Sequence, residues 1–81
     1  MINAMTPKFG KAEANIEIDY ITYSGSAFAI CENGDQVFLN ARIIEKMKLE
    51  EGDICSALLL KNYDDKSEVT PWRAVRVSAA V

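Results

Sequence analysis

The feature that most constrains the fold is a pair of short apolar runs separated by Glu32-Asn33-Gly34-Asp35. Asn-Gly between two apolar runs is a strong hairpin signal, because both residues tolerate the positive φ that a tight turn requires. We therefore predict a β-hairpin with strands at residues 26–31 and 36–40.

The two faces of this predicted hairpin differ in side-chain size. In the first strand, Ala27 and Ala29 share one face and Phe28 lies on the other. In the second strand, Phe38 lies on the same side of the hairpin as Phe28. Small side chains suit the crowded interior of a five-stranded barrel. We expect the alanines to point inward and the two phenylalanines to point outward, toward a ligand. The alternative is that both rings pack in the core, the ordinary position of phenylalanine.

The rest of the chain predicts three more strands and one helix. Residues 16–23 alternate apolar and charged side chains, residues 54–62 hold the longest apolar run, and residues 72–78 form a last strand. Residues 41–48 instead place isoleucines at helical spacing behind Asn40, a candidate N-cap. Five short strands with one helical turn after the third are typical of a small all-β, OB-like Greek-key barrel.

Strict alternation predicts which side chains share a face in the outer strands. It places Tyr20 on the same face as Ile16 and Ile18 in the first strand, and Arg76 on the same face as Trp72 and Ala74 in the last.

The chain divides into an N-terminal arm and one domain. We expect residues 1–14 to form a flexible arm and residues 15–81 to form the barrel. Phe9, between Lys8 and Lys11, is consistent either with an arm that contacts a polynucleotide or with a cap on the open end of the core. At 81 residues, a single core is only just sufficient, so a homodimer remains open.

Most catalytic chemistry is excluded by residue type. The chain has no histidine, so common zinc sites and Ser-His-Asp triads cannot be assembled from one copy. Cys31 and Cys55 lie among apolar neighbours and predict buried free thiols. Asp64 and Asp65 are expected in a solvated loop, with weak binding of a divalent cation as the alternative. We expect no enzyme, no cofactor and no metal site.

Charge and hydropathy limit the partners. The chain lacks both an apolar run of about 18 residues and the apolar core of a signal peptide, so we expect a cytoplasmic protein without membrane contact. Its net charge is −3, with 9 basic and 12 acidic side chains, which gives no long-range attraction to phosphate. Single strands can still bind by stacking their bases on aromatic rings.

Several segments between Gly25 and Val77 occur in the order found in a known family. The strand from Gly25 to Ile30, the strand from Val37 to Leu39 and the turn from Leu49 to Asp53 resemble those of a cold-shock domain, and residues 73–77 resemble its closing strand. Residues 32–40 are less closely similar to the S1-type barrels of translation initiation factors. Both resemblances imply an OB fold that binds single-stranded RNA or DNA with low sequence specificity.

The cold-shock resemblance also implies site residues. Phe28 and Phe38 correspond to stacking platforms, Tyr23 to a third, Asn40 stands where the family usually has a histidine, and Ile30 replaces a strand aromatic. With residues chosen for charge and aromaticity near the ends of the last two strands, the predicted nucleic-acid-binding set is Tyr23, Phe28, Ile30, Phe38, Asn40, Lys61, Tyr63, Trp72, Arg73 and Arg76.

Two alternatives stay open at this point. Trp72 is consistent with a cap at the bottom of the barrel as well as with a ligand contact. The aromatic face as a whole is consistent with a protein–protein interface, formed with a second copy or with an adaptor partner, and the acidic balance of the chain favours such an interface.

Overall fold

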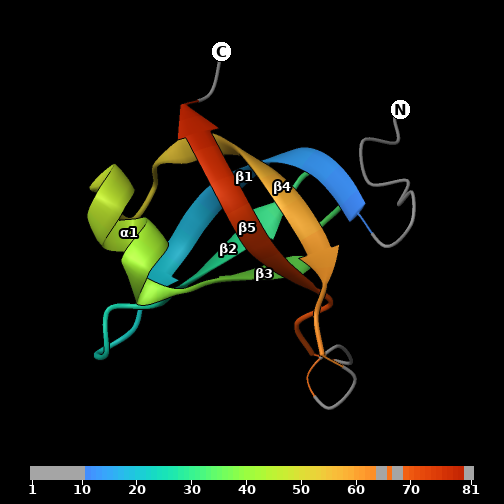
Figure 1. The fold of residues 1–81 in the computed structure, drawn as a ribbon, viewed down its shortest axis with the longest axis horizontal. Helices are drawn as coiled ribbons and strands as arrows, with labels where there is room; N and C mark the ends of the chain where they lie inside the picture. The colour runs from blue at the N-terminus through green and yellow to red at the C-terminus, as the bar shows by residue number, and fades with distance from the viewer. Residues whose placement is uncertain (1–10, 64–65, 67–68, 80–81) are drawn as a thin grey trace.

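Five strands close into a barrel around one hydrophobic core (Figure 1). The computed structural model describes residues 11–63, 66 and 69–79. The elements in chain order are β1 (Lys11–Ile21), β2 (Ala27–Cys31), β3 (Gln36–Leu39), α1 (Ala41–Met47), β4 (Ile54–Lys61) and β5 (Trp72–Ala79). The strand order around the barrel is β1-β2-β3-β5-β4, and only the β3–β5 pair is parallel. The predicted all-β, OB-like barrel with one short helix after the third strand is confirmed.

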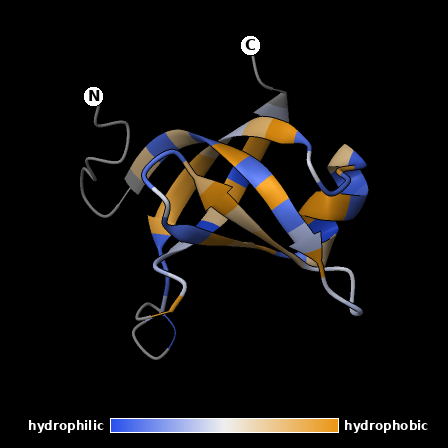
Figure 2. Ribbon diagram, turned by 180° about the vertical axis from the view of Figure 1, so that it is seen from behind, coloured by the Kyte–Doolittle hydropathy of each residue, from blue (hydrophilic) through white to orange (hydrophobic). Residues whose placement is uncertain are grey.

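Small and branched side chains fill the barrel interior. Ala27, Ala29, Val37 and Leu39 are all fully buried, so the hairpin turns its alternate small residues inward as expected. Figure 2 shows the resulting alternation of hydrophobic and hydrophilic residues along the strands. Because the alanines take little room, strands of a narrow barrel can approach across its axis.

The hairpin turn and the helix start follow their local sequence signals. Gly34 adopts a φ of 93°, and its N–H donates to the carbonyl of Cys31 at 2.8 Å. At the start of α1, the Asn40 side chain accepts a hydrogen bond from the N–H of Ile43 at 2.9 Å, which confirms the predicted N-cap. Ile44 then packs into the core from the helix.

Strand β1 begins earlier than predicted. Residues 11–14, expected in the N-terminal arm, pair with β4 from Lys11↔Leu60 to Ala14↔Ala57. Ala12 and Ala14 are buried, so they continue the inward face of the strand. The prediction was wrong here because two alanines alone carry little apolar signal in sequence. Residues 1–10, including Lys8 and Phe9, lie outside the described part.

Two β-bulges overturn the strict alternation expected for the outer strands. In β1 the register to β2 shifts between Ile18 and Tyr20, which turns Tyr20 outward although Ile16 and Ile18 point inward. In β5, Leu58 pairs with Arg76 while Leu59 pairs with Ala74, so that one extra residue turns Arg76 outward. A bulge adds one residue to one strand and thereby reverses the face of every residue after it.

Within the described residues, no helix is long and apolar enough to cross a membrane.

Candidate nucleic-acid interface

A row of side chains crosses the outer face of four neighbouring strands. Tyr20 of β1 pairs with Phe28 of β2, Phe28 pairs with Phe38 of β3, and Phe38 pairs with Arg73 of β5. The ring centroids of Tyr20 and Phe28 lie 5.3 Å apart, and those of Phe28 and Phe38 lie 5.6 Å apart. Directly opposed residues on one sheet face are close enough to form such a continuous contact.

Arg73 carries this row toward the loop after β4. Its guanidinium carbon lies 4.8 Å from the centroid of the Tyr63 ring, the geometry of a cation–π contact. Its Nε atom is buried and has no hydrogen-bond partner within the part of the chain that the structure describes. The pair therefore places a cation, stacked on a flat ring, beside Phe38.

Three members of the row, Phe28, Phe38 and Arg73, line a groove of about 920 Å³ between α1, the outer face of β3 and β5, and the β4–β5 loop. Its described lining residues are Phe28, Phe38, Asn40, Arg42, Ile43, Lys46, Asn62, Tyr63, Lys66, Val69, Thr70, Arg73, Ala74 and Val75. Every charged side chain in this set is cationic. The groove thus combines an apolar floor with positive walls, although the whole chain is acidic.

Hydrogen bonds hold the wall formed by the β4–β5 loop. The Asn62 side-chain amide donates to the carbonyl of Thr70 at 2.9 Å, and the Thr70 hydroxyl donates to Oε1 of Gln36 at 2.6 Å. Asn62 and Thr70 are both buried. These bonds tie the two ends of the loop to each other and to Gln36 of β3, and Tyr63, which contacts Arg73, directly follows Asn62.

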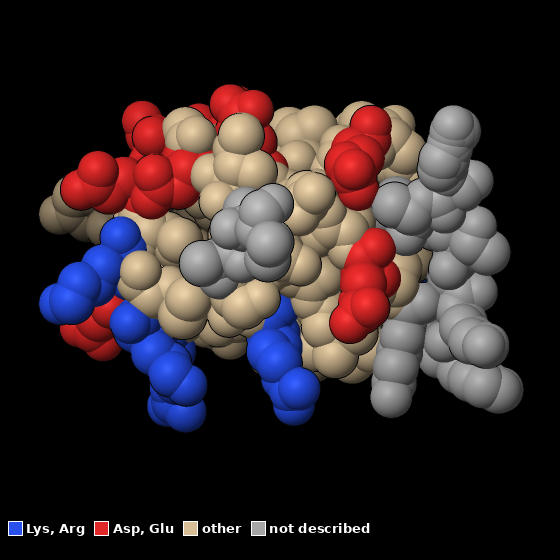
Figure 3. All heavy atoms as spheres, turned by 90° about the horizontal axis from the view of Figure 1, so that it is seen from above, with Lys and Arg blue, Asp and Glu red and all other residues tan. Residues whose placement is uncertain are grey.

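The charges of the molecule separate by side. Figure 3 shows Lys and Arg side chains projecting along one side of the molecule, whereas most Asp and Glu atoms visible in that view lie elsewhere. Arg42 and Lys46 of α1 are exposed and line the groove. A local basic surface therefore exists despite the net charge of −3.

The structure brings together five of the ten predicted site residues. Phe28, Phe38, Asn40, Tyr63 and Arg73 all line the groove. Both phenylalanines are half-buried and lie outside the core, as expected from the inward position of the alanines. Asn40 lines the groove while its Oδ1 atom accepts the capping hydrogen bond from the N–H of Ile43.

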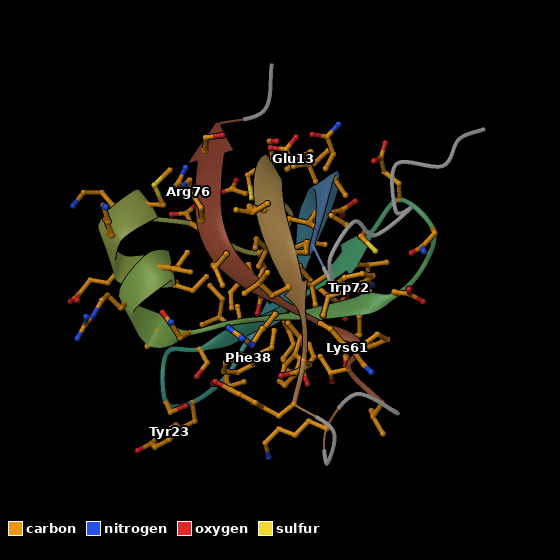
Figure 4. The ribbon with its side chains drawn as sticks, turned by 45° about the vertical axis from the view of Figure 1, so that its right-hand side comes forward. Glu13, Tyr23, Phe38, Lys61, Trp72 and Arg76 are labelled. Atoms are coloured by element: carbon orange, nitrogen blue, oxygen red, sulfur yellow. The ribbon has the colours of Figure 1, made fainter. Side chains whose placement is uncertain are left out.

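Four other predicted residues are exposed but do not line the groove. Tyr23 projects into solvent from the loop between β1 and β2, away from Phe38 (Figure 4). Ile30 lies on the outer face of β2 opposite Gln36, and Lys61 lies at the end of β4. Arg76 lies beyond the bulge in β5, at a distance from Phe38 in the same view.

Trp72 belongs to the core and does not line the groove. Its side chain is only 8% exposed, and its indole N–H donates to Oδ2 of Asp35 at 3.1 Å. Placing Trp72 among the ligand contacts was wrong, and the structure supports its alternative role as a barrel cap. A tryptophan that is both large and able to donate one hydrogen bond suits a buried position beside a carboxylate.

Sequence reasoning missed Tyr20, Arg42 and Lys46. Tyr20 takes the position in the aromatic row that the family resemblance assigned to Tyr23, because the bulge in β1 turns it outward. Its signal was present in the sequence: a tyrosine among isoleucines is the residue of that strand best suited to a half-exposed position. The two helix cations lie within the predicted helix at residues 41–48, but their position beside the groove depends on the tertiary fold.

The two thiols are not part of this surface. Cys31 and Cys55 are buried and free, which confirms the prediction. Burial raises the pKa of the Cys31 thiol, although hydrogen bonds involving Asn33 and Asp35 act in the opposite direction. Burial also raises the pKa of the Cys55 thiol, and the negative charge of Asp53 adds to this effect.

Among the described residues, no group of three or more His, Cys, Asp or Glu side chains is placed to hold a metal ion. Asp64 and Asp65, the residues considered for weak cation binding, lie outside the described part of the chain.

No family model, curated protein or solved structure matches the chain.

Proposed function

We propose that this protein binds single-stranded nucleic acid, RNA or DNA, with little sequence preference, and that it acts by binding without catalysis. The observation that supports this proposal best is the row of Tyr20, Phe28, Phe38 and Arg73 on the outside of the barrel. Aromatic rings on a sheet surface accept the flat faces of unpaired bases, and neighbouring cations contact the phosphates. A cytoplasmic location is part of the same proposal.

The magnitude of base stacking makes this role compatible with an acidic chain. Each base stacked on an aromatic ring contributes about 1–3 kcal/mol, and a Kd of about 1 μM corresponds to about −8 kcal/mol. Three rings together with a few phosphate contacts therefore suffice for micromolar binding. A strongly positive long-range field is not required.

Low sequence preference follows from the type of contact. Every base has a π-face, so stacking discriminates weakly between bases. Discrimination requires hydrogen bonds to base edges, and three amide atoms of the two groove asparagines are already engaged. Oδ1 of Asn40 caps α1, and the Asn62 amide donates to the carbonyl of Thr70 and accepts from the N–H of Tyr63.

The proposal is tested by fluorescence anisotropy of a labelled, mixed-sequence single strand of about ten nucleotides at low salt. Phe28→Ala and Phe38→Ala are each expected to weaken binding by about fivefold to 150-fold, since each removes a stacking ring. Phe38→Tyr keeps a ring and is expected to bind as the wild type does. Ile30→Ala is the matched control, because Ile30 shares the outer face of β2 with Phe28 but does not line the groove.

Sedimentation separates this role from the alternative interaction barrel. A monomer that binds the oligonucleotide and loses affinity in Phe38→Ala supports the proposal. A tight dimer that dissociates in Phe38→Ala, with no binding to any mixed-sequence single strand, contradicts it and identifies the groove as a protein interface.

A further inference from the structure

The two ends of the aromatic row differ in charge. At one end, the row passes from Phe38 to Arg73, and the groove there is flanked by Arg42, Lys46 and Lys66. At the other end, it stops at Tyr20, the last ring, which is 43% exposed. A bound nucleic-acid strand that follows the row therefore passes from a cationic region toward the end of β1. There, at residues 18–21, β1 extends beyond its pairing with β4 and has a short edge.

An acidic turn lies directly along that edge. Residues 50–53, Glu-Glu-Gly-Asp, connect α1 to β4. The N–H of Ile18 donates to the carbonyl of Asp53 at 2.9 Å, and the N–H of Gly52 donates to the carbonyl of Ile18 at 2.8 Å. These bonds pair the turn with β1 at the position where the row ends.

One carboxylate of the turn is hydrogen-bonded to the backbone of the residue that follows Tyr20. Oε2 of Glu51 accepts a hydrogen bond from the N–H of Ile21 at 3.0 Å, and Ile21 directly follows Tyr20. Asp19, the residue before Tyr20, is exposed, as are Glu50 and Glu51. A phosphate that continued past Tyr20 would thus meet several like charges, one of them held in place by a backbone hydrogen bond.

We propose that the acidic turn ends the nucleic-acid path at Tyr20, so that this surface favours the end of a single strand over an internal segment. The inference rests on the proposed function, because it concerns the same aromatic row. Stackable bases at a strand terminus can occupy all the rings without placing a phosphate beyond Tyr20. An internal segment must continue past Tyr20 and either approach the carboxylates or turn away from the barrel.

The test uses strands of equal length and charge that differ only in where the stackable bases lie. A block of about four bases is placed at the 5′ end, at the 3′ end or in the centre of an otherwise abasic strand. For the wild type, one terminal block is expected to bind roughly two- to fivefold more tightly than the central block, the size expected of exposed charge–charge effects. Equal affinity for all three strands would overturn the inference.

A pair of double variants identifies the cause. Glu50→Gln with Glu51→Gln removes two of the three negative charges of the turn and keeps an acceptor for Ile21, so the terminal preference is expected to weaken strongly. Glu13→Gln with Glu32→Gln changes the net charge equally, at exposed positions away from Tyr20, and is expected to keep the preference. The same preference in both double variants would also overturn the inference. Failure of every strand to bind would contradict the proposed function itself and is thus a distinguishable result.

Discussion

Trp72 is the first residue of β5, and Phe38 of β3 pairs with the next residue, Arg73. The two aromatic side chains nevertheless lie in different environments. Trp72 is buried and bonded to Asp35, whereas Phe38 lines the groove. Trp72→Phe is expected to lower the free energy of unfolding by about 2 kcal/mol, since it removes a hydrogen bond and leaves a small cavity. Urea unfolding measures this loss. The same variant is expected to bind oligonucleotide with unchanged affinity, and a large loss of affinity at intact stability would contradict the buried role.

The buried thiols predict how stability depends on pH. The pKa of both thiols is raised above the ordinary value of 9.0 by burial, so above that pH the unfolded chain releases protons that the folded chain retains. Stability contributed by the neutral thiols is therefore fully present below pH 9.0 and is lost as pH rises through the higher folded pKa. Urea unfolding from about pH 7 to about pH 10 is expected to show this decline. The decline should be smaller in the Cys31→Ala, Cys55→Ala double variant, and an equal decline in both proteins would contradict it.

At the scale of elements, one residue at the start of α1 contributes both to helix stability and to the lining of the groove. Asn40 caps the helix with its side chain and also lines the groove. Asn40→Ala is expected to lower the free energy of unfolding by about 1 kcal/mol through loss of the cap. Asn40→Asp keeps a capping acceptor but adds a negative charge to a cationic groove, so stability is expected to hold while oligonucleotide affinity falls. Thermal unfolding and anisotropy on the same two variants check both expectations, and equal affinity of Asn40→Asp and wild type would argue against phosphate near α1.

The strands also show how far sequence patterns determine this fold. The hairpin was predictable because Asn33-Gly34 marks the turn and the alternation of Ala27, Phe28 and Ala29 marks the two faces. The positions of Tyr20 and Arg76 were not predictable from the same rule. Each follows a β-bulge, and a bulge is set by how neighbouring strands fit around the barrel, which a count of every second residue does not contain.

The candidate site likewise contains residues that local sequence patterns predict and residues whose positions depend on the tertiary fold. Phe28 and Phe38 were found because inward alanines leave outward rings, a local consequence of strand geometry. Trp72 was misplaced because its burial depends on Asp35, a residue far away in sequence that supplies its hydrogen-bond partner. The contribution of α1 to the groove depends likewise on where the helix packs, which the helical spacing of its isoleucines does not specify.

At the scale of the whole molecule, the proposed binding is expected to depend on where charges lie more than on their sum. The net charge of −3 is spread over the chain, but the described charged residues of the groove are Arg42, Lys46, Lys66 and Arg73. If each contacts one phosphate, the slope of log K against log salt is expected to reach about −3 for a single strand. Such a slope would be modest compared with that of strongly basic proteins, because under the proposed function base stacking on the rings supplies much of the affinity.

The salt dependence of binding is expected to differ between variants of groove cations and variants of other cations. Lys46→Ala removes a groove cation and is expected to make the slope shallower by about 0.7, as measured by anisotropy between about 50 and about 200 mM salt. Arg76→Ala removes an equal charge from the outer face beyond the bulge in β5 and is expected to leave the slope unchanged, since Arg76 does not line the groove. Equal changes in the two variants would mean that the strand responds to the overall charge of the protein. This result would contradict phosphate contacts at α1 and the proposed position of the nucleic acid across Phe38 and Arg73.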